Sequence, residues 1–182
     1  MNPTTAALHA ACTAQATIAS PLGPILLART AKGLAGAWFE GQEHHPGTFS
    51  APTRPDDPLL ARTALQLRAY FAGEAGGFDL PLDLHGTPFQ RAVWQALLVV
   101  GVGQTRSYGE IATAIGAASA VRAVGGAIGR NPVSVIVPCH RVIGRDGSLT
   151  GYAGGVQRKQ ALLTLERAAR AHAPPTLAEA AA

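Results

Sequence analysis

A thiol and an imidazole stand side by side in an otherwise apolar stretch, as Cys139 and His140. Cysteine attacks electrophiles as its thiolate, and a thiol with the usual pKa of about 8.5 is only slightly ionised near neutral pH. An adjacent imidazole is a natural base for such a thiol. The pair therefore predicts nucleophilic chemistry at Cys139, with His140 as the group that takes its proton.

The surrounding run from Val135 to Ile143 is rich in β-branched residues and indicates a buried strand or strand-like connector. Adjacent side chains of an extended segment point to opposite faces, so a turn or a bridging water would be needed to connect Cys139 with His140. A buried free cysteine is also commonly a small apolar core residue. Cys139 alone leaves both interpretations open.

Charge is distributed unevenly along the 182 residues, of which 47% are hydrophobic, enough for one large or two small domains. Residues 1–85 carry five Lys and Arg against seven Asp and Glu, and residues 86–182 carry ten against four. The resulting −2 and +6 sum to the overall +4. A basic second half favours a polyanionic partner, although a solvated basic surface is the commoner explanation.

Only two cysteines occur, Cys12 and Cys139, too few for a disulfide framework and without metal-type spacing. The first dozen residues lack the basic segment and continuous apolar core of a signal peptide. No segment approaches the roughly 18 uninterrupted apolar residues of a membrane span. We therefore expect a cytoplasmic setting, no membrane partner and no bound metal.

Three short β-like runs occupy the beginning of the chain, at residues 14–20, 25–29 and 34–39. Turn signals separate them, with Pro21-Leu22-Gly23-Pro24 between the first two. Together these runs predict a three-stranded antiparallel meander.

A loop and a helix follow the meander. His44 and His45 open a proline-rich stretch that we expect to be a surface loop, with solvated histidines favoured over a metal pair. Residues 58–71 predict a helix, because apolar residues recur there at helical spacing. These residues are Leu59, Leu60, Ala64, Leu65, Leu67 and Phe71. Residues 80–84 alternate in polarity and predict an edge strand.

From Thr87 onward the pattern is helical. Thr87 is a good N-cap with proline at the next position, and the helix that it begins ends before Gly101. Its predicted apolar stripe consists of Phe89, Ala92, Val93, Leu97 and Val100, with Trp94 joining the core. Ser107 and Glu110 have the spacing of a capping box and begin a short helix that ends at Gly116.

A further short helix, capped by Ser119, is expected to end at about Gly129, and the two short helices resemble a helix-turn-helix. Small residues line the second helix: Ala120, Ala123, Gly125, Gly126 and Ala127. Such residues let a helix backbone approach a nucleic-acid groove closely. From this region alone, a purely structural packing role is slightly favoured for them.

The remaining signals surround the central stretch. Asn131-Pro132 ends the second helix, and residues 144–147 form a hairpin-like turn. A glycine-rich loop at residues 151–155 precedes a helix at residues 156–170, which carries Glu166 near its core side. The inward residues of that helix are Ala161, Leu162 and Leu165. The Ala- and Pro-rich remainder from Ala171 is expected to be disordered.

These blocks together resemble the O6-alkylguanine-DNA alkyltransferases. The resemblance is carried by Pro138-Cys139-His140-Arg141-Val142, by Arg122-Ala123-Val124-Gly125-Gly126-Ala127 with Asn131-Pro132, and by Gly151-Tyr152-Ala153-Gly154-Gly155. It covers residues from about Thr87 to Glu166 and, more loosely, Thr17 to Gly41. It implies an α+β protein: a ribonuclease-H-like N-terminal domain (1–85), a mainly helical, winged-helix-like domain with a helix-turn-helix (86–170), and a tail (171–182).

The resemblance implies a suicidal repair reaction without a cofactor. An alkyl group would pass from O6 of guanine, or also from O4 of thymine, to Cys139 and remain there as a thioether. His140 would be the base, acting through a water, and Glu166 would orient that imidazole. Asn131 would brace the turn before the nucleophile, and Tyr108 would donate a proton to the leaving guanine.

It also implies double-stranded DNA as the partner, bound in the minor groove by a monomer, with cooperative assembly left open. Arg122 would fill the space of the flipped base. The other expected DNA contacts are Ser107, Tyr108, Ala123, Gly125 and Ala127. The base pocket would be formed by Val142, Tyr152, Ala153 and Gly154. Ala153 stands where some members have serine, so only the backbone donor toward O6 is expected.

Two other classes of function stay open. A non-catalytic lesion-binding protein would flip the base without reacting, but proteins of that type replace the nucleophile that Cys139 provides here. A thiol hydrolase could use Cys139 and His140 without DNA, although the arginine and small-residue pattern upstream argues against it. The zinc site of some relatives is not expected, because Cys12 has no second cysteine partner.

Overall fold

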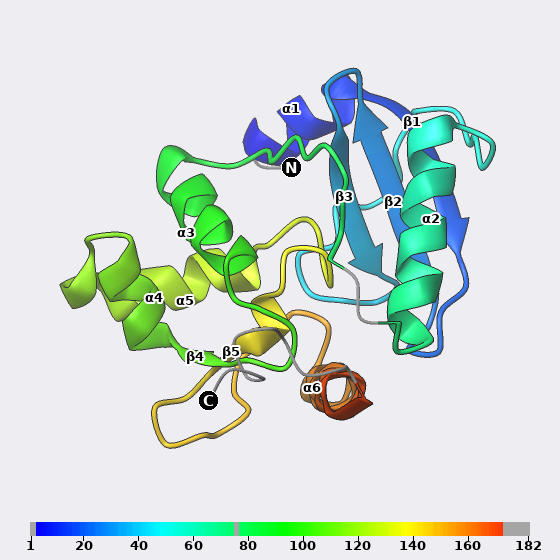
Figure 1. Ribbon diagram of the computed structural model, residues 1–182. Coiled ribbons are helices and arrows are strands. Elements are labelled where there is room, and N and C mark those ends of the chain that lie inside the picture. Colours follow the sequence, from blue (N-terminus) through cyan, green and yellow to red (C-terminus); the bar gives the residue numbers. More distant parts are fainter. Residues whose placement is uncertain (1–2, 75–76, 173–182) are drawn as a thin grey trace.

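An antiparallel sheet of three strands, in the order β1-β2-β3, forms the N-terminal part of the protein. The computed structural model describes residues 3–74 and 77–172. The strands are β1 (Cys12–Ile18), β2 (Ile25–Thr30) and β3 (Leu34–Phe39) (Figure 1). The predicted meander is therefore confirmed, with β1 beginning two residues earlier than expected.

The sheet is buried on both faces at β3, where all six residues from Leu34 to Phe39 are buried. One face packs in the main core with residues of α2 (Pro58–Phe71), which include Leu60, Leu67 and Tyr70. The other face forms a smaller cluster, made of Leu8, Ala28, Ala35, Trp38, Phe49 and Ala51. A strand covered on both sides needs apolar residues at consecutive positions, which explains the run Leu-Ala-Gly-Ala-Trp-Phe.

The bounds predicted for α2 are confirmed, and its first turn is capped by Asp57, whose carboxylate accepts hydrogen bonds from the backbone of Leu59 and Leu60. One expected core residue is wrong, because the Leu65 side chain is 64% exposed. Successive helical residues are rotated by about 100°, so Leu65 lies off the stripe on which Leu60, Ala64 and Leu67 are buried.

A helix that the sequence did not predict, α1 (Pro3–Ala11), precedes the sheet. It places Leu8 in the smaller core cluster. His9 stacks on Phe49 with ring centroids 4.3 Å apart, and its Nε2 lies 2.9 Å from the Pro46 carbonyl. The expected loop after β3 thus packs in part against α1. Among the described residues, no group of three or more His, Cys, Asp or Glu could hold a metal ion.

The predicted edge strand at residues 80–84 is wrong. Only a single parallel bridge joins Leu82 to Leu34, through hydrogen bonds from Leu34 N to Pro81 O (2.7 Å) and from Asp83 N to Leu34 O (2.8 Å). The ladder stops there because proline has no N–H with which to continue it.

The second half contains α3 (Pro88–Leu98), α4 (Tyr108–Ala114), α5 (Val121–Gly129) and α6 (Val156–His172), and α5 contacts both α3 and α4. Both predicted N-caps of α3 and α4 are confirmed, each as a complete capping box. The predicted Ser119 cap is wrong. Ser119 lies within the 3-10 turn η1 (Ala118–Ala120), and α5 begins without a side-chain cap.

The buried face of α3 differs from the predicted stripe. Phe89 is 37% exposed and Ala92 is also exposed, whereas Trp94 is buried and donates its indole N–H to Ala127 O at 2.8 Å. The remaining buried residues of this face are Val93, Leu97 and Val100. The large Trp94 ring fixes the rotation of the helix, and this rotation brings Phe89 and Ala92 to the outer side.

The two halves meet at the centre of the molecule. Ala37 N donates to Pro132 O (2.9 Å) and Ser134 N donates to Ala37 O (2.8 Å), so the segment after α5 adds a short bridge to β3. Figure 1 shows the sheet and α2 on one side, α3, α4 and α5 on the other, and the yellow segment between them. One core cluster contains residues of both halves. The exact domain boundaries stay a prediction, and the tail from Ala173 lies outside the described residues. None of the described helices is long and apolar enough to cross a membrane.

Candidate active site

The cysteine lies on a tight turn and not on a strand, which corrects the sequence prediction. Residues 134–137 form turns, Cys139–Arg141 form the 3-10 helix η2, and only β5 (Val142–Ile143) is extended, pairing in parallel with β4 (Arg106–Ser107). The predicted burial is correct, since Cys139 is 4% exposed. Val135 has a left-handed φ of 72°, a strain of about 1–3 kcal/mol for a β-branched residue that surrounding contacts must offset.

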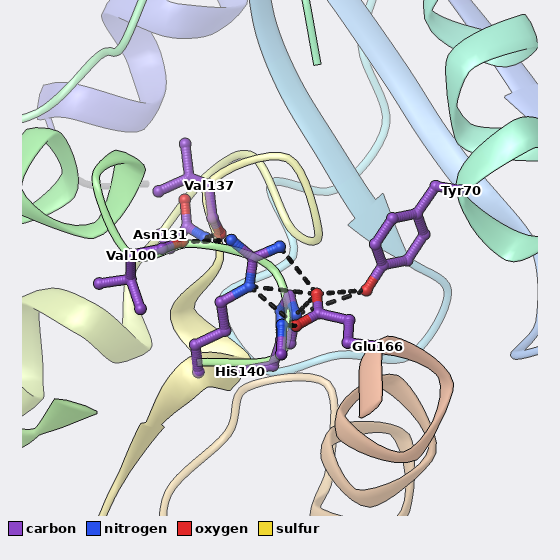
Figure 2. Close-up of polar contacts among 8 residues, drawn as sticks. Tyr70, Val100, Asn131, Val137, His140 and Glu166 are labelled. Carbon is purple, nitrogen blue, oxygen red and sulfur yellow. Dashed lines mark hydrogen bonds and ion pairs between the residues drawn. The ribbon is translucent and has the colours of Figure 1, made fainter. Parts of the chain in front are cut away.

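Asn131 connects the end of α5 to this turn and to the thiol. Its Nδ2 donates to Val137 O at 2.8 Å and lies 3.0 Å from Cys139 Sγ, while its Oδ1 accepts from Val133 N at 3.0 Å (Figure 2). The amide is buried at 4% exposure. One side chain thus holds the turn and presents an N–H to the sulfur, an arrangement that stabilises a developing thiolate.

The resting thiol is protonated. Burial raises the pKa of Cys139 to about 11, against the opposing effects of the Asn131 hydrogen bond and the Lys159 charge. Nucleophilic attack by this sulfur therefore requires a proton acceptor within the site.

His140 is fully buried, and its two nitrogens have different surroundings. Nε2 lies 2.8 Å from Glu166 Oε1, whereas Nδ1 is buried without a hydrogen-bond partner among the described residues. Burial lowers the pKa of His140, with Glu166 opposing, so the neutral ring donates Nε2–H to the carboxylate. Nδ1 then carries the free electron pair and is the nitrogen able to accept a proton.

Glu166 is 1% exposed and receives hydrogen bonds from four residues: Tyr70, Gly103, His140 and Arg141. Arg141 donates through Nε at 2.9 Å and through Nη2 at 2.8 Å, and its Nη1 donates to Val100 O. The hydrogen bonds from His140 and Arg141 hold the pKa of Glu166 far below its usual range, although burial alone would raise it. The carboxylate is therefore ionised throughout the neutral range.

Lys159 is a functional candidate that the sequence analysis missed. It is fully buried, donates from Nζ to Thr150 O at 2.8 Å, and burial lowers its pKa to about 8 with Cys139 opposing. Its position three residues before Leu162 and seven before Glu166 places it on the same face of α6. Tyr70 and Arg141 were also given no role, although Arg141 adjoins the Cys-His pair.

The glycine-rich loop lies beside Tyr108. The Tyr108 hydroxyl donates to Thr150 O at 2.8 Å, and Tyr152 is buried while Ala153 is half-buried. A Cβ on Gly154 would lie 2.5 Å from the Tyr152 ring, so this position requires glycine. The expected pocket residue Val142 is fully buried beside this region in β5.

The N-terminal half holds this loop in place. Glu43 N donates to Ala153 O at 2.8 Å. Arg158 donates to Gly154 O at 3.0 Å and to Leu22 O at 2.9 Å, which joins the loop to the turn between β1 and β2.

The expected DNA contacts divide into two groups. Arg122 and Ala123 are exposed on α5, and Gly125 lies half-buried beside the Tyr108 ring. Ala127 is 4% exposed and faces Trp94, so the structure does not bring its side chain to the surface with the others. Ser107 serves as the cap of α4, where its Oγ accepts from Glu110 N.

The stability of the folded protein should decrease as the pH falls from about 7.5. His140 and Glu166 both have lowered folded-state pKa values, so the unfolded chain binds more protons below their unfolded values of about 6.5 and 4.3. Urea unfolding at pH 7.5, 5.5 and 4 measures this loss. In Glu166→Gln the part of the decrease below about pH 5 should shrink, and a free energy of unfolding that rises on acidification would contradict the assignment.

Comparison with known proteins agrees with this geometry. The family model described as the ribonuclease-like domain of 6-O-methylguanine DNA methyltransferase matches residues 14–84, and that of its DNA binding domain matches residues 88–168. The chain is 52% identical over 161 residues to a methylated-DNA–protein-cysteine methyltransferase of Mycobacterium tuberculosis, covering 88% of this chain and 96% of the relative. A similarly named protein of Methanosarcina barkeri is 49% identical over 150 residues, covering 82% and 94%.

Solved structures agree as well. The crystal structure of Mycobacterium tuberculosis OGT in complex with DNA is 49% identical, with a TM-score of 0.78 over 86% of this chain and 94% of that chain. Both domains are thus matched by sequence, and their arrangement is matched by structure over 86% of this chain. The chain belongs to the 6-O-methylguanine DNA methyltransferase family.

Proposed function

We propose that this protein repairs O6-alkylguanine in double-stranded DNA by transferring the alkyl group to Cys139. The observation that carries the proposal is the polarised His140 ring beside the cysteine on η2, with Nε2–H held by Glu166 and Nδ1 free to accept a proton. Glu166 is ionised and accepts the Nε2–H of His140, so it can stabilise the imidazolium that would form. The family name and the DNA complex of the M. tuberculosis relative support the same function.

In the proposed reaction, the thiol proton of Cys139 passes through a water to His140 Nδ1, and the thiolate attacks the alkyl carbon. The S–C bond forms as the C–O6 bond breaks, and the electron pair stays on the guanine oxygen. Tyr108 then supplies a proton to the released base. A thioether is a stable product, so each protein molecule would act once.

Binding to the duplex is assigned to the exposed start of α5. Arg122 would occupy the space left by the flipped base, while small neighbours such as Ala123 let the helix enter the minor groove. The excess of basic residues after position 85 favours a polyanionic partner for the C-terminal half. We propose that the protein acts as a cytoplasmic monomer and that residues 1–85 and 86–170 are its two domains.

The flipped base would lie against the glycine-rich loop, with Tyr152 to Gly154 as its wall and Val142 beneath. Ala153 has no hydroxyl, so only backbone N–H groups would face O6. The hydrogen bonds from Glu43 and Arg158 hold the loop against the N-terminal half, which supports a preformed pocket. O4-alkylthymine is a second candidate substrate of the same pocket.

The test is to incubate the protein with a duplex that carries one O6-methylguanine and to record intact and peptide masses. A single added methyl group on the Cys139 peptide, with guanine restored in the duplex, is the expected result. Tight lesion-selective binding without a mass change would instead indicate a lesion-binding protein. The absence of both binding and transfer would overturn the proposal.

Lys159→Gln is expected to slow the transfer about tenfold at pH 7 and to shift the pH–rate profile toward higher pH. The variant removes a positive charge that lowers the pKa of the Cys139 thiol, so less thiolate forms at a given pH. Single-turnover rates with free O6-benzylguanine between pH 6 and 9.5 measure the shift. Lys32→Gln, which removes an exposed lysine between β2 and β3, is the matched control and should behave as wild type.

A further inference from the structure

A tyrosine of the N-terminal domain reaches the acid–base pair of the C-terminal domain. Tyr70 is the penultimate residue of α2 and is 6% exposed. Its hydroxyl donates to Glu166 Oε1 at 2.8 Å and lies 3.5 Å from His140 Nε2. Figure 2 shows the ring pointing from α2 toward the carboxylate on α6. The contact joins residues that are 96 positions apart in the chain.

The oxygen that Tyr70 contacts is the one that holds the imidazole. Glu166 Oε1 accepts from Tyr70 and from His140 Nε2, both at 2.8 Å, and from Arg141 Nη2, also at 2.8 Å. Several donors on one oxygen fix its direction and draw negative charge away from the N–H of His140. Each added donor therefore weakens the stabilisation that the carboxylate gives to the imidazolium.

The packing of the ring does not require this hydroxyl. The Tyr70 ring contacts Phe71 and Phe78, with centroids 5.4 and 5.5 Å away, and phenylalanine would make the same contacts. Phenylalanine would also avoid a buried hydroxyl, which is costly in an apolar core unless it is hydrogen-bonded. Here its partner is the carboxylate of the proposed acid–base pair.

We propose that Tyr70 is a positioning residue of the alkyl transfer, through which the N-terminal domain orients Glu166 and limits the basicity of His140. This inference rests on the proposed function, because it assigns His140 the role of base. Among the described residues, the other charged or titratable groups around the pair are Arg141 and Cys139 on η2, Lys159 on α6 and Tyr152 in the glycine-rich loop. All of them are unchanged in a Tyr70→Phe protein.

Tyr70→Phe should move the acid limb of the pH–rate profile up by about one pH unit. Without the hydroxyl, Glu166 Oε1 binds Nε2–H more strongly, His140 becomes more basic, and the ring is protonated at a higher pH. We expect the single-turnover rate with free O6-benzylguanine to fall by up to about tenfold on the acid side of the wild-type limb and to change less than about threefold at pH 8.5. A purely structural role would lower the rate by one factor at all pH values.

Thr63→Val is the matched control. Thr63 is a fully buried residue of the same helix, and its hydroxyl donates to Leu59 O within α2. This variant should keep the acid limb of the wild-type pH–rate profile. In a Glu166→Gln background, Tyr70→Phe should change the rate less than twofold at every pH, because its effect passes through the carboxylate.

The two proposals can fail separately. If wild-type protein gains no alkyl mass on Cys139, the proposed function is wrong and the inference about Tyr70 is wrong with it. If wild-type protein is alkylated but Tyr70→Phe has an unmoved acid limb, or shows its full effect in the Glu166→Gln background, only the role of Tyr70 is overturned.

Discussion

Cys139→Ala is expected to transfer no methyl group while it still binds duplex DNA that carries O6-methylguanine. The sulfur is the proposed nucleophile, so its removal leaves the alkyl carbon without an attacking atom, whereas the exposed residues of α5 are untouched. Cys139 is small and buried, and alanine occupies the same space without a new polar group, so the fold should persist. Intact mass after incubation measures transfer, and a gel-shift titration at fixed salt measures binding.

The second cysteine provides the matched control. Cys12 is half-buried in β1, and its thiol pKa is raised to about 11, as is that of Cys139. Burial and the nearby Asp83 carboxylate both disfavour the Cys12 thiolate, whereas Asn131 and Lys159 favour that of Cys139. Cys12→Ala should therefore accept one methyl group at the wild-type rate. A methyl group on Cys139→Ala, or a loss of transfer in Cys12→Ala, would show that the nucleophile has been assigned wrongly.

Local signals predicted the helices best. The predicted caps at Thr87 and Ser107 lie within three residues of the groups that they bind, so the sequence contains both partners. The central stretch misled the prediction, because its β-branched composition favours a strand. Its turns are instead held by the bridge of Ser134 to Ala37, which is distant in sequence, and by the Asn131 amide, which lies six residues before Val137.

The site was predictable in its residue types but not in its geometry. The sequence indicated Cys139, His140 and Glu166, and the structure shows His140 hydrogen-bonded to Glu166 and next to Cys139 in η2. The sequence does not indicate which imidazole nitrogen faces the carboxylate, because that depends on the angle between η2 and α6. The Tyr70 contact was equally hidden, because a tyrosine on an apolar helix face is indistinguishable from any core tyrosine until its partner is located.

Arg122→Ala is expected to reduce repair of O6-methylguanine in a duplex by about 100-fold or more, with little change in the reaction with free O6-benzylguanine. Extruding a base costs a few kcal/mol of stacking and pairing, and each 1.4 kcal/mol is about tenfold in rate. A side chain that fills the vacated space offsets part of that cost. The free base needs no extrusion, so its reaction depends only on the pocket and Cys139.

Arg130→Ala also removes one positive charge, just after the end of α5. It therefore separates the filling of the flipped base's space by Arg122 from general attraction to phosphate. Arg130 is exposed like Arg122, and its Nη1 donates to Gly126 O within the helix. Loss of attraction alone should weaken duplex binding similarly in both variants and make each less dependent on salt. Only Arg122→Ala should also slow the single-turnover step at saturating DNA, because that step contains the extrusion. Equal losses with duplex and free base in Arg122→Ala would place the arginine in the pocket or in the fold, and not in the space of the flipped guanine.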